Sequence, residues 1–211
     1  MPTATWWNLD AQKRDAIVQA ALYEFAAHNY AQASLSAIVK SLGIAKGSVY
    51  QYFTDKEEFY LYTVKWASDR VMHHLERTIP VAVLAHGDAF AIFRHYLHAC
   101  LQLRHTLPAE SQLIQRALID TGPQRMLAQE IGAATHTRFI EELVLNGIAN
   151  RSLKSTIDPR VYQFVLQIVV SHVDIVVQRA HTQALSEAEI VVFCDQLVTM
   201  LDQGMRYQLR K

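Results

Sequence analysis

The hydrophobic and polar positions of residues 34–56 predict two short helices that meet at a sharp corner. Apolar residues recur on one face over residues 35–42, and Ser34 directly before them is a favourable helix N-cap. Gly43 stands where this helix must end, at a position that favours a left-handed backbone. A second helix, apolar inside and polar outside, is expected over residues 45–52. Two short helices around a tight glycine turn are the helix-turn-helix pattern.

Helical spacing of apolar residues continues along the rest of the chain. One helix is expected before the motif, over residues 8–28, and another after it, over residues 55–79, where Pro80 would stop it. Residues 1–7 are expected to form a frayed arm. Five further helices are expected over residues 88–107, 110–120, 123–146, 158–181 and 186–209. Since no alternating run bounded by hairpin turns is present, the sequence predicts an all-α protein of about nine helices.

The polar outer face of the second short helix carries residues suited to contact another surface. Gly47 lies inside that helix, where glycine costs about 1 kcal/mol relative to alanine but allows close approach. Lys56 falls in the first turn of the next helix, where a cation is unfavourable unless it faces a phosphate. Tyr50 and Tyr52 offer hydroxyl donors, which commonly bind phosphate. The residues expected to contact DNA are Ser34, Lys46, Gly47, Ser48, Tyr50, Gln51, Tyr52 and Lys56.

A wider set of residues accompanies this motif. It consists of Ser34, Ile38, the run 43–50, Phe53, Lys56, Glu57 and Phe59, with Ile17, Ala21, Phe25 and Tyr30 upstream. This combination resembles the DNA-binding head of TetR-type transcriptional regulators. Two positions depart from the pattern of that family. Asn29 replaces the usual glycine, and Ala45 replaces the Ser or Thr that usually caps the second helix.

Composition limits where DNA could bind and in which compartment the protein works. The chain of 211 residues is 51% apolar and has a formal net charge of zero, so any DNA-binding surface must be local. Three lysines stand against one aspartate within residues 34–56. The two cysteines form no disulfide framework, residues 1–10 contain no apolar leader, and polar residues interrupt the apolar run 161–177. These features predict a soluble, cytoplasmic protein without a membrane span.

The last two predicted helices have wide apolar faces. A helix that is apolar around most of its circumference needs one partner in its own subunit and a second one elsewhere. A deep monomeric core would satisfy this pattern, but a two-fold homodimer is favoured, and the TetR resemblance implies it too. The residues predicted at the dimer interface are Val169, Val173, Val177, Ile190, Cys194, Leu197, Leu201 and Met205.

The body is also expected to bind a small-molecule effector, as the resemblance implies. Arg104 continues a buried stripe, so its charge is expected either at the mouth of a cavity or, by snorkelling, in solvent. An apolar or aromatic effector is expected, because the candidate lining has few polar groups. That lining comprises Phe93, Tyr96, Leu97, Cys100, Arg104, Phe139, Leu143, Phe164 and His172.

The sequence contains no pattern typical of catalysis or of metal binding. His95, His98, Cys100 and His105 lie close together along the chain, but no second ligand pair accompanies them. A nucleophile elbow, a phosphate-binding glycine loop and a dinucleotide fingerprint are all absent from the sequence. The protein is therefore predicted not to be an enzyme and to need no metal or cofactor.

Together these patterns predict a one-component transcriptional regulator, a repressor that binds an inverted-repeat operator as a homodimer and responds to a small molecule. Residues 1–54 would form the helix-turn-helix DNA-binding domain, and residues 55–211 the effector-binding and dimerisation domain. Two alternatives remain open: a helical ligand-binding protein or enzyme whose head docks protein, and an architectural DNA binder without an effector. Salt-dependent binding to duplex DNA would exclude the first alternative, and a cavity in the body would count against the second.

Overall fold

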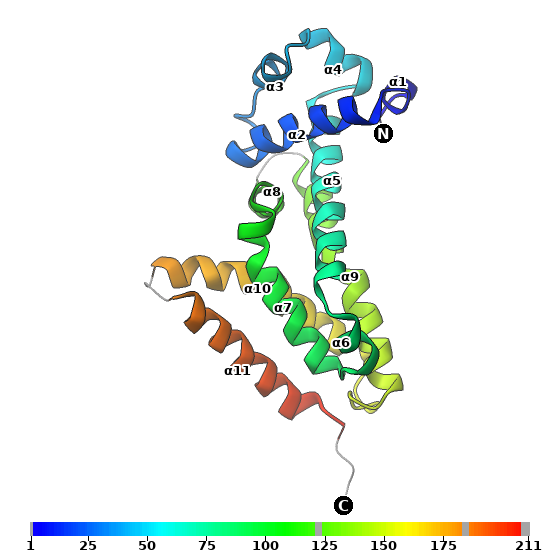
Figure 1. The fold of residues 1–211 in the computed structure, drawn as a ribbon, viewed down its shortest axis with the longest axis vertical. Helices are drawn as coiled ribbons and strands as arrows, with labels where there is room; N and C mark the ends of the chain where they lie inside the picture. Colours follow the sequence, from blue (N-terminus) through cyan, green and yellow to red (C-terminus); the bar gives the residue numbers. More distant parts are fainter. Residues whose placement is uncertain (1, 121–123, 183–185, 208–211) are drawn as a thin grey trace, which may run out of the picture. The chain divides into compact units, whose positions relative to one another are not determined.

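The protein is all-α, as its computed structural model shows (Figure 1). The structure describes residues 2–120, 124–182 and 186–207, and these residues form eleven helices. The helices are α1 Ala4–Trp7, α2 Ala11–Ala27, α3 Leu35–Leu42, α4 Lys46–Tyr52, α5 Lys56–Thr78, α6 Val81–His86, α7 Ala89–Thr106, α8 Pro108–Ile119, α9 Arg125–Ala149, α10 Pro159–Thr182 and α11 Glu187–Met205.

Two of these helices were not expected from the sequence. The stretch predicted to be a frayed arm contains α1, which is anchored because Trp6 is fully buried. The predicted stop at Pro80 is confirmed, but Pro80 is also the N-cap of α6. A proline in this position both ends one helix and fixes the backbone angle with which the next one begins.

The helices pack into two compact units. Unit 1 comprises Met1–Val71 and Arg104–Thr135, and unit 2 comprises Met72–Leu103 and His136–Lys211. Helices α5, α7 and α9 contribute residues to both units. The predicted division into a DNA-binding domain and an effector domain is a division by function, and it stays a prediction.

Aromatic side chains build the core of unit 1. Phe53 stacks on Phe59 with ring centroids 4.5 Å apart, and Phe25 meets Tyr60 edge to face at 5.1 Å. Burying one such side chain contributes about 1.5–3 kcal/mol, so these rings hold the short helices α3 and α4 against α2 and α5. Residues from α8 and α9 complete the same core: Leu113, Ala117 and Ala128.

In unit 2, the start of α7 is joined to the end of α11. Asp88 accepts hydrogen bonds from the backbone N–H groups of Phe90 and Ala91, and its second carboxylate oxygen pairs with Arg206 at 2.7 Å. Burial opposes ionisation of Asp88, but these donors outweigh it and lower the pKa of its carboxyl group. Leu153, which follows α9, forms an isolated antiparallel bridge with Arg206. The end of α11 is thereby fixed to two other segments of unit 2.

Candidate DNA-binding site and effector cavity

The turn between α3 and α4 has the geometry that the sequence predicts. Ser34 caps α3, since its hydroxyl oxygen accepts the N–H of Ala37 at 3.3 Å. Gly43 ends the helix in the left-handed conformation with φ of 66°. The N–H of Ile44 then donates to the carbonyl oxygen of Val39 at 3.1 Å. The corner that orients α4 is therefore held by local hydrogen bonds and by a glycine that a side chain would strain.

Helix α4 presents a polar surface to solvent. Val49 is 1% exposed and anchors the helix to the core of unit 1. Ala45 is the N-cap and makes no side-chain cap bond, as its departure from the family pattern implies. The side chain of Lys46 lies outside the described part of the structure, although its backbone belongs to the first turn of α4. The remaining residues predicted on the outer side are exposed or partly exposed: Gly47, Ser48, Tyr50 and Gln51.

Tyr52 does not lie on the outer face predicted for it. It is 5% exposed, and its ring packs on Trp6 with centroids 5.7 Å apart. Residues two apart on a helix do not face the same side, so Tyr50 and Tyr52 cannot both point outward. The placement of Tyr52 is corrected accordingly: it belongs to the core that supports α4.

The N-terminal residues hold the carboxyl end of α4. Thr3 donates its backbone N–H to the carbonyl oxygen of Tyr52 at 2.9 Å and its hydroxyl to that of Gln51 at 2.6 Å. These carbonyl groups have no partner within the helix, so Thr3 supplies one. Trp6 is fully buried, and its indole N–H donates to the hydroxyl of Tyr62 at 3.2 Å. Helix α1 lies beside α4 and fixes its far end (Figure 1).

Lys56, predicted to contact phosphate, makes contacts within unit 1. Its ammonium group donates to the carbonyl oxygen of Tyr30 and lies 4.7 Å from the centroid of the Tyr30 ring. Burial lowers the pKa of Lys56, while the carboxylates of Glu24 and Asp120 act in the opposite direction. An ammonium group has three donors, so a phosphate contact by Lys56 stays a prediction.

Helix α8 is bonded at both of its ends to segments that flank the helix-turn-helix motif. Near its carboxyl end, Arg116 donates to a backbone carbonyl of α2, and Asp120 accepts the backbone N–H of Tyr30 at 3.1 Å. Near its start, the buried Glu110 pairs with Arg70 of α5 at 3.0 Å. A shift of α8 would therefore act directly on the helices that position α4.

Most residues predicted to line the effector pocket form a packed core in unit 2. Tyr96 stacks on Phe139 with ring centroids 3.9 Å apart. The Tyr96 hydroxyl lies 2.6 Å from Nδ1 of His136. Burial lowers the pKa of His136 to about 4, so its ring is neutral where it meets the Tyr96 hydroxyl. Four of the predicted residues are at most 3% exposed: Phe93, Tyr96, Leu97 and Cys100.

Two further residues predicted for the pocket lie in other places, and a third has no described side chain. Phe164 is 66% exposed on α10. Arg104 belongs to unit 1 and is partly buried, and its Nε makes no hydrogen bond in the described structure. The side chain of His172 lies outside the described residues.

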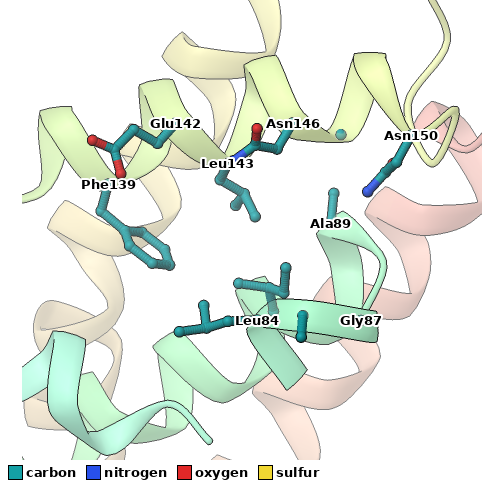
Figure 2. Close-up of a pocket in the computed structure, with 11 residues that line it drawn as sticks. Leu84, Gly87, Ala89, Phe139, Glu142, Leu143, Asn146 and Asn150 are labelled. Atoms are coloured by element: carbon teal, nitrogen blue, oxygen red, sulfur yellow. The ribbon is translucent and has the colours of Figure 1, made fainter. Parts of the chain in front are cut away.

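A cavity of about 240 Å³ lies in unit 2 between α6, the start of α7 and the second half of α9 (Figure 2). Phe139 and Leu143 are the predicted pocket residues that line it. The other lining residues were not predicted for a pocket, because α6, which forms one wall, was not expected from the sequence. They are Leu84, Ala85, Gly87, Ala89, Ile92, Glu142, Asn146, Gly147 and Asn150.

The residues predicted at the dimer interface are divided between core and surface. Val173, Ile190 and Cys194 are 5%, 3% and 1% exposed, so unit 2 itself buries them. The side chain of Val177 lies outside the described residues, and the others are partly exposed: Val169, Leu197, Leu201 and Met205. Exposed apolar side chains lie on the same two helices: Phe164 and Ile168 on α10, and Val192, Phe193 and Met200 on α11.

Within the described residues, no group of three or more His, Cys, Asp or Glu side chains could hold a metal ion. His98 lies 2.9 Å from a carboxylate oxygen of Asp195, which also pairs with Arg94 at 2.9 Å. Burial raises the pKa of the Cys194 thiol to about 11, so this cysteine stays protonated and unreactive. Every helix in the described ranges is too short or too polar to cross a lipid bilayer.

Comparison with known proteins agrees with this architecture. Residues 17–63 match the family model of bacterial regulatory proteins of the tetR family. A TetR family transcriptional regulator from Chloroflexus aurantiacus J-10-FL is 30% identical, with a TM-score of 0.68, and the match covers 99% of this chain and 100% of that one. A search of curated proteins gave no match.

Two further solved structures share the fold at lower identity. FadR from Bacillus subtilis in complex with stearoyl-CoA is 17% identical, with a TM-score of 0.71 over 90% of this chain and 98% of that one. The reduced form of E. coli NemR is 16% identical, with a TM-score of 0.69 over 93% and 99% of the two chains.

The fold is that of a helix-turn-helix DNA-binding protein with a helical body. The chain belongs to the TetR family of transcriptional regulators.

Proposed function

We propose that the chain is a repressor that acts in the cytoplasm, binds an inverted-repeat operator as a homodimer and releases it when a small molecule binds. The observation that carries this proposal is the rigid corner at Gly43. It presents α4 outside the core, with a polar surface and with exposed backbone at Gly47. A helix held in this way can enter the major groove of DNA with its first residues at the base edges. The family membership supports the same conclusion.

The exposed apolar residues of α10 and α11 support a homodimer. Phe193, Leu197 and Met200 recur at intervals of four and three, so they lie on one face of α11. Large apolar side chains gathered on one surface mark an interaction site, and a two-fold dimer is the commonest assembly of soluble proteins. A dimer also matches the two half-sites of an inverted repeat.

Helices that run through both units can transmit a conformational change from the effector site to the DNA-binding helices. Helix α5 begins beside the DNA-binding helices in unit 1 and ends in unit 2, which contains the cavity. An effector releases DNA only if it binds the DNA-incompetent arrangement more tightly than the competent one. Effector and operator must then weaken each other by the same factor.

The test is selection of a preferred duplex from a random pool by the purified protein. We expect an inverted repeat whose half-sites lie about one helical turn apart, bound by two subunits. Affinity for this operator should fall with rising salt and exceed affinity for random duplex by about 10³-fold or more. A protein that selects no sequence and binds random duplex no better than an acidic polymer would refute the proposal.

Replacing either of two lysines should separate base recognition from phosphate binding. Lys46→Ala is expected to cost about 1–3 kcal/mol on the operator and to relax the preference for one base pair in each half-site. Lys56→Ala should weaken binding to all sequences alike and reduce the salt slope by about 2 per dimer. Titration of both variants against operator and random duplex at several salt concentrations distinguishes these results. Equal loss on both duplexes for Lys46→Ala would make Lys46 a phosphate contact only.

Gly47→Ala is expected to stabilise the protein and weaken operator binding. A Cβ at Gly47 would meet no atom within 4 Å, so alanine fits the free protein. Alanine is favoured over glycine inside a helix by about 1 kcal/mol, which raises Tm by about 2–4 °C for a chain of this size. The added methyl group would hold α4 away from DNA. Thermal unfolding and operator titration of the same sample measure both effects, and unchanged operator affinity would show that α4 needs no close approach here.

A further inference from the structure

The cavity in unit 2 has one apolar side and one polar side. Helix α9, with Asn150 directly after it, contributes two parallel rows with the same spacing of four residues, so each row follows one line along the helix. The apolar row is Phe139, Leu143 and Gly147, and the polar row is Glu142, Asn146 and Asn150. The wall opposite α9 consists of small and aliphatic residues from α6, from the start of α7 and from the turn between them: Leu84, Ala85, Gly87, Ala89 and Ile92 (Figure 2).

The charge of this lining is negative. Among the lining residues that the structure describes, Glu142 is the ionisable one, and none is Lys, Arg or His. One oxygen of Glu142 accepts a hydrogen bond from Arg138 at 3.0 Å, and both side chains are largely exposed. An anion that entered the cavity would lose hydration without finding a cation among these described residues.

The amides of the polar row can bind an uncharged ligand. The side-chain oxygen of Asn150 already accepts from the backbone N–H and the hydroxyl of Ser152, at 3.0 Å and 2.7 Å. Its amide nitrogen is therefore the group left to donate, and Figure 2 shows it directed toward Ala89. Asn146, one turn earlier, adds a second exposed amide.

The size of the cavity limits the ligand. At about 240 Å³ it is smaller than the roughly 300–1,000 Å³ that is typical for drug-sized ligands. Only a compact molecule fits, and a long acyl chain joined to a multiply phosphorylated nucleotide is excluded by both size and charge.

We propose that this cavity binds a compact amphiphile that is uncharged or cationic, with its apolar part on the Leu143 row and its polar group on the Glu142 row. The role of this ligand as the effector rests on the proposed function. The cavity wall includes α6, which follows α5 after only Ile79 and Pro80. A ligand that moves α6 therefore acts on the end of the helix shared by both units.

Probes that share a six-carbon chain and differ in charge test the ligand class. Hexylammonium, hexan-1-ol, hexanoate and hexanoyl-CoA are titrated into the full-length protein by calorimetry. Binding of hexylammonium and hexan-1-ol is expected, with no detectable binding of hexanoate or hexanoyl-CoA. Hexanoate bound as tightly as hexylammonium, or failure of both hexylammonium and hexan-1-ol to bind, would overturn the proposal.

Two pairs of variants place the binding at this cavity. Glu142→Gln should weaken hexylammonium about fivefold and leave hexan-1-ol unchanged, because a partly exposed charge contributes modestly. Glu141→Gln, its neighbour outside the lining, should change neither. Ala85→Phe fills the cavity from an exposed position and should abolish binding of both probes, whereas Ala82→Phe on the same helix should not. Unchanged binding to the Ala85→Phe variant would place the ligand elsewhere and refute the assignment.

Operator binding of the ligand-free protein, measured separately, distinguishes the two hypotheses. If the protein selects an operator but binds neither favoured probe, the cavity proposal fails and the regulator proposal stands. If it binds both probes at the cavity but selects no operator, the ligand class stands and the proposed function fails.

Discussion

Phe193→Glu is expected to convert the protein from a dimer to a folded monomer. Phe193 is 46% exposed on α11 and lies on the same face as Leu197 and Met200. In the proposed interface the new carboxylate would be buried without a partner, at a cost of about 3–5 kcal/mol. Two-fold symmetry places one such carboxylate in each subunit. The dissociation constant of the dimer should therefore rise at least 100-fold, and sedimentation at micromolar concentration would measure this change.

Leu145→Glu provides the matched control. Leu145 is 60% exposed on α9, and the substitution introduces the same charge in place of a large apolar side chain at a site outside the proposed interface. This variant should remain a dimer with unchanged helix content. A wild-type protein that sediments as a folded monomer at micromolar concentration would exclude the dimer, whatever the variants do.

Trp6→Ala is expected to destabilise unit 1 and to abolish operator binding. Trp6 is fully buried between Tyr52, Phe53 and Tyr62, with ring centroids 4.9–5.7 Å away. Truncating a buried aromatic residue to alanine costs about 3–5 kcal/mol, because a cavity remains where the ring was. The midpoint of thermal unfolding should fall by about 10 °C. The carboxyl end of α4 would also lose the support that α1 gives it.

Trp7→Ala is the control for this experiment. Trp7 is adjacent in sequence and 56% exposed, so its truncation should change stability by no more than about 0.5 kcal/mol. Operator affinity is then measured at a temperature where both variants are folded. A loss of affinity at that temperature reflects a misplaced α4 and not an unfolded protein. A Trp6→Ala variant that unfolds at the wild-type temperature would show that α1 is dispensable.

The features that sequence alone predicts best are those encoded by a few neighbouring residues. Ser34 and Gly43 specify the start and end of α3 through their own backbone and side-chain preferences, and both behave as predicted. Tyr52 shows that two tyrosines close in sequence cannot be treated alike, because the roughly half a turn of helix between them places Tyr50 at the surface and Tyr52 in the core. Lys56 shows that a cation can find its partner, the carbonyl of Tyr30, far away in sequence.

The effector cavity could not be predicted because it depends on packing between distant segments. An apolar residue such as Tyr96 or Leu97 has the same sequence pattern whether it fills a core or lines a cavity, and here both are fully buried. The cavity is instead set by α6, a helix of six residues with no strong periodic signal. Ile190 and Cys194 illustrate the same ambiguity on α11, where unit 2 itself buries the residues predicted for the dimer.

Unit 1 is built from two separate segments of the chain, and this determines where two related regulators can be joined into a hybrid. A hybrid joined after residue 54 would separate α4 from Leu113, Ala117 and Ala128, which complete its hydrophobic core. It would also replace Arg116 and Asp120, which bind the backbone beside the motif. Exchange of DNA specificity between two relatives should therefore transplant Met1–Val71 together with Arg104–Thr135. If the hybrid is joined at the ends of these two segments, the core of unit 1 keeps all the side chains that pack in it.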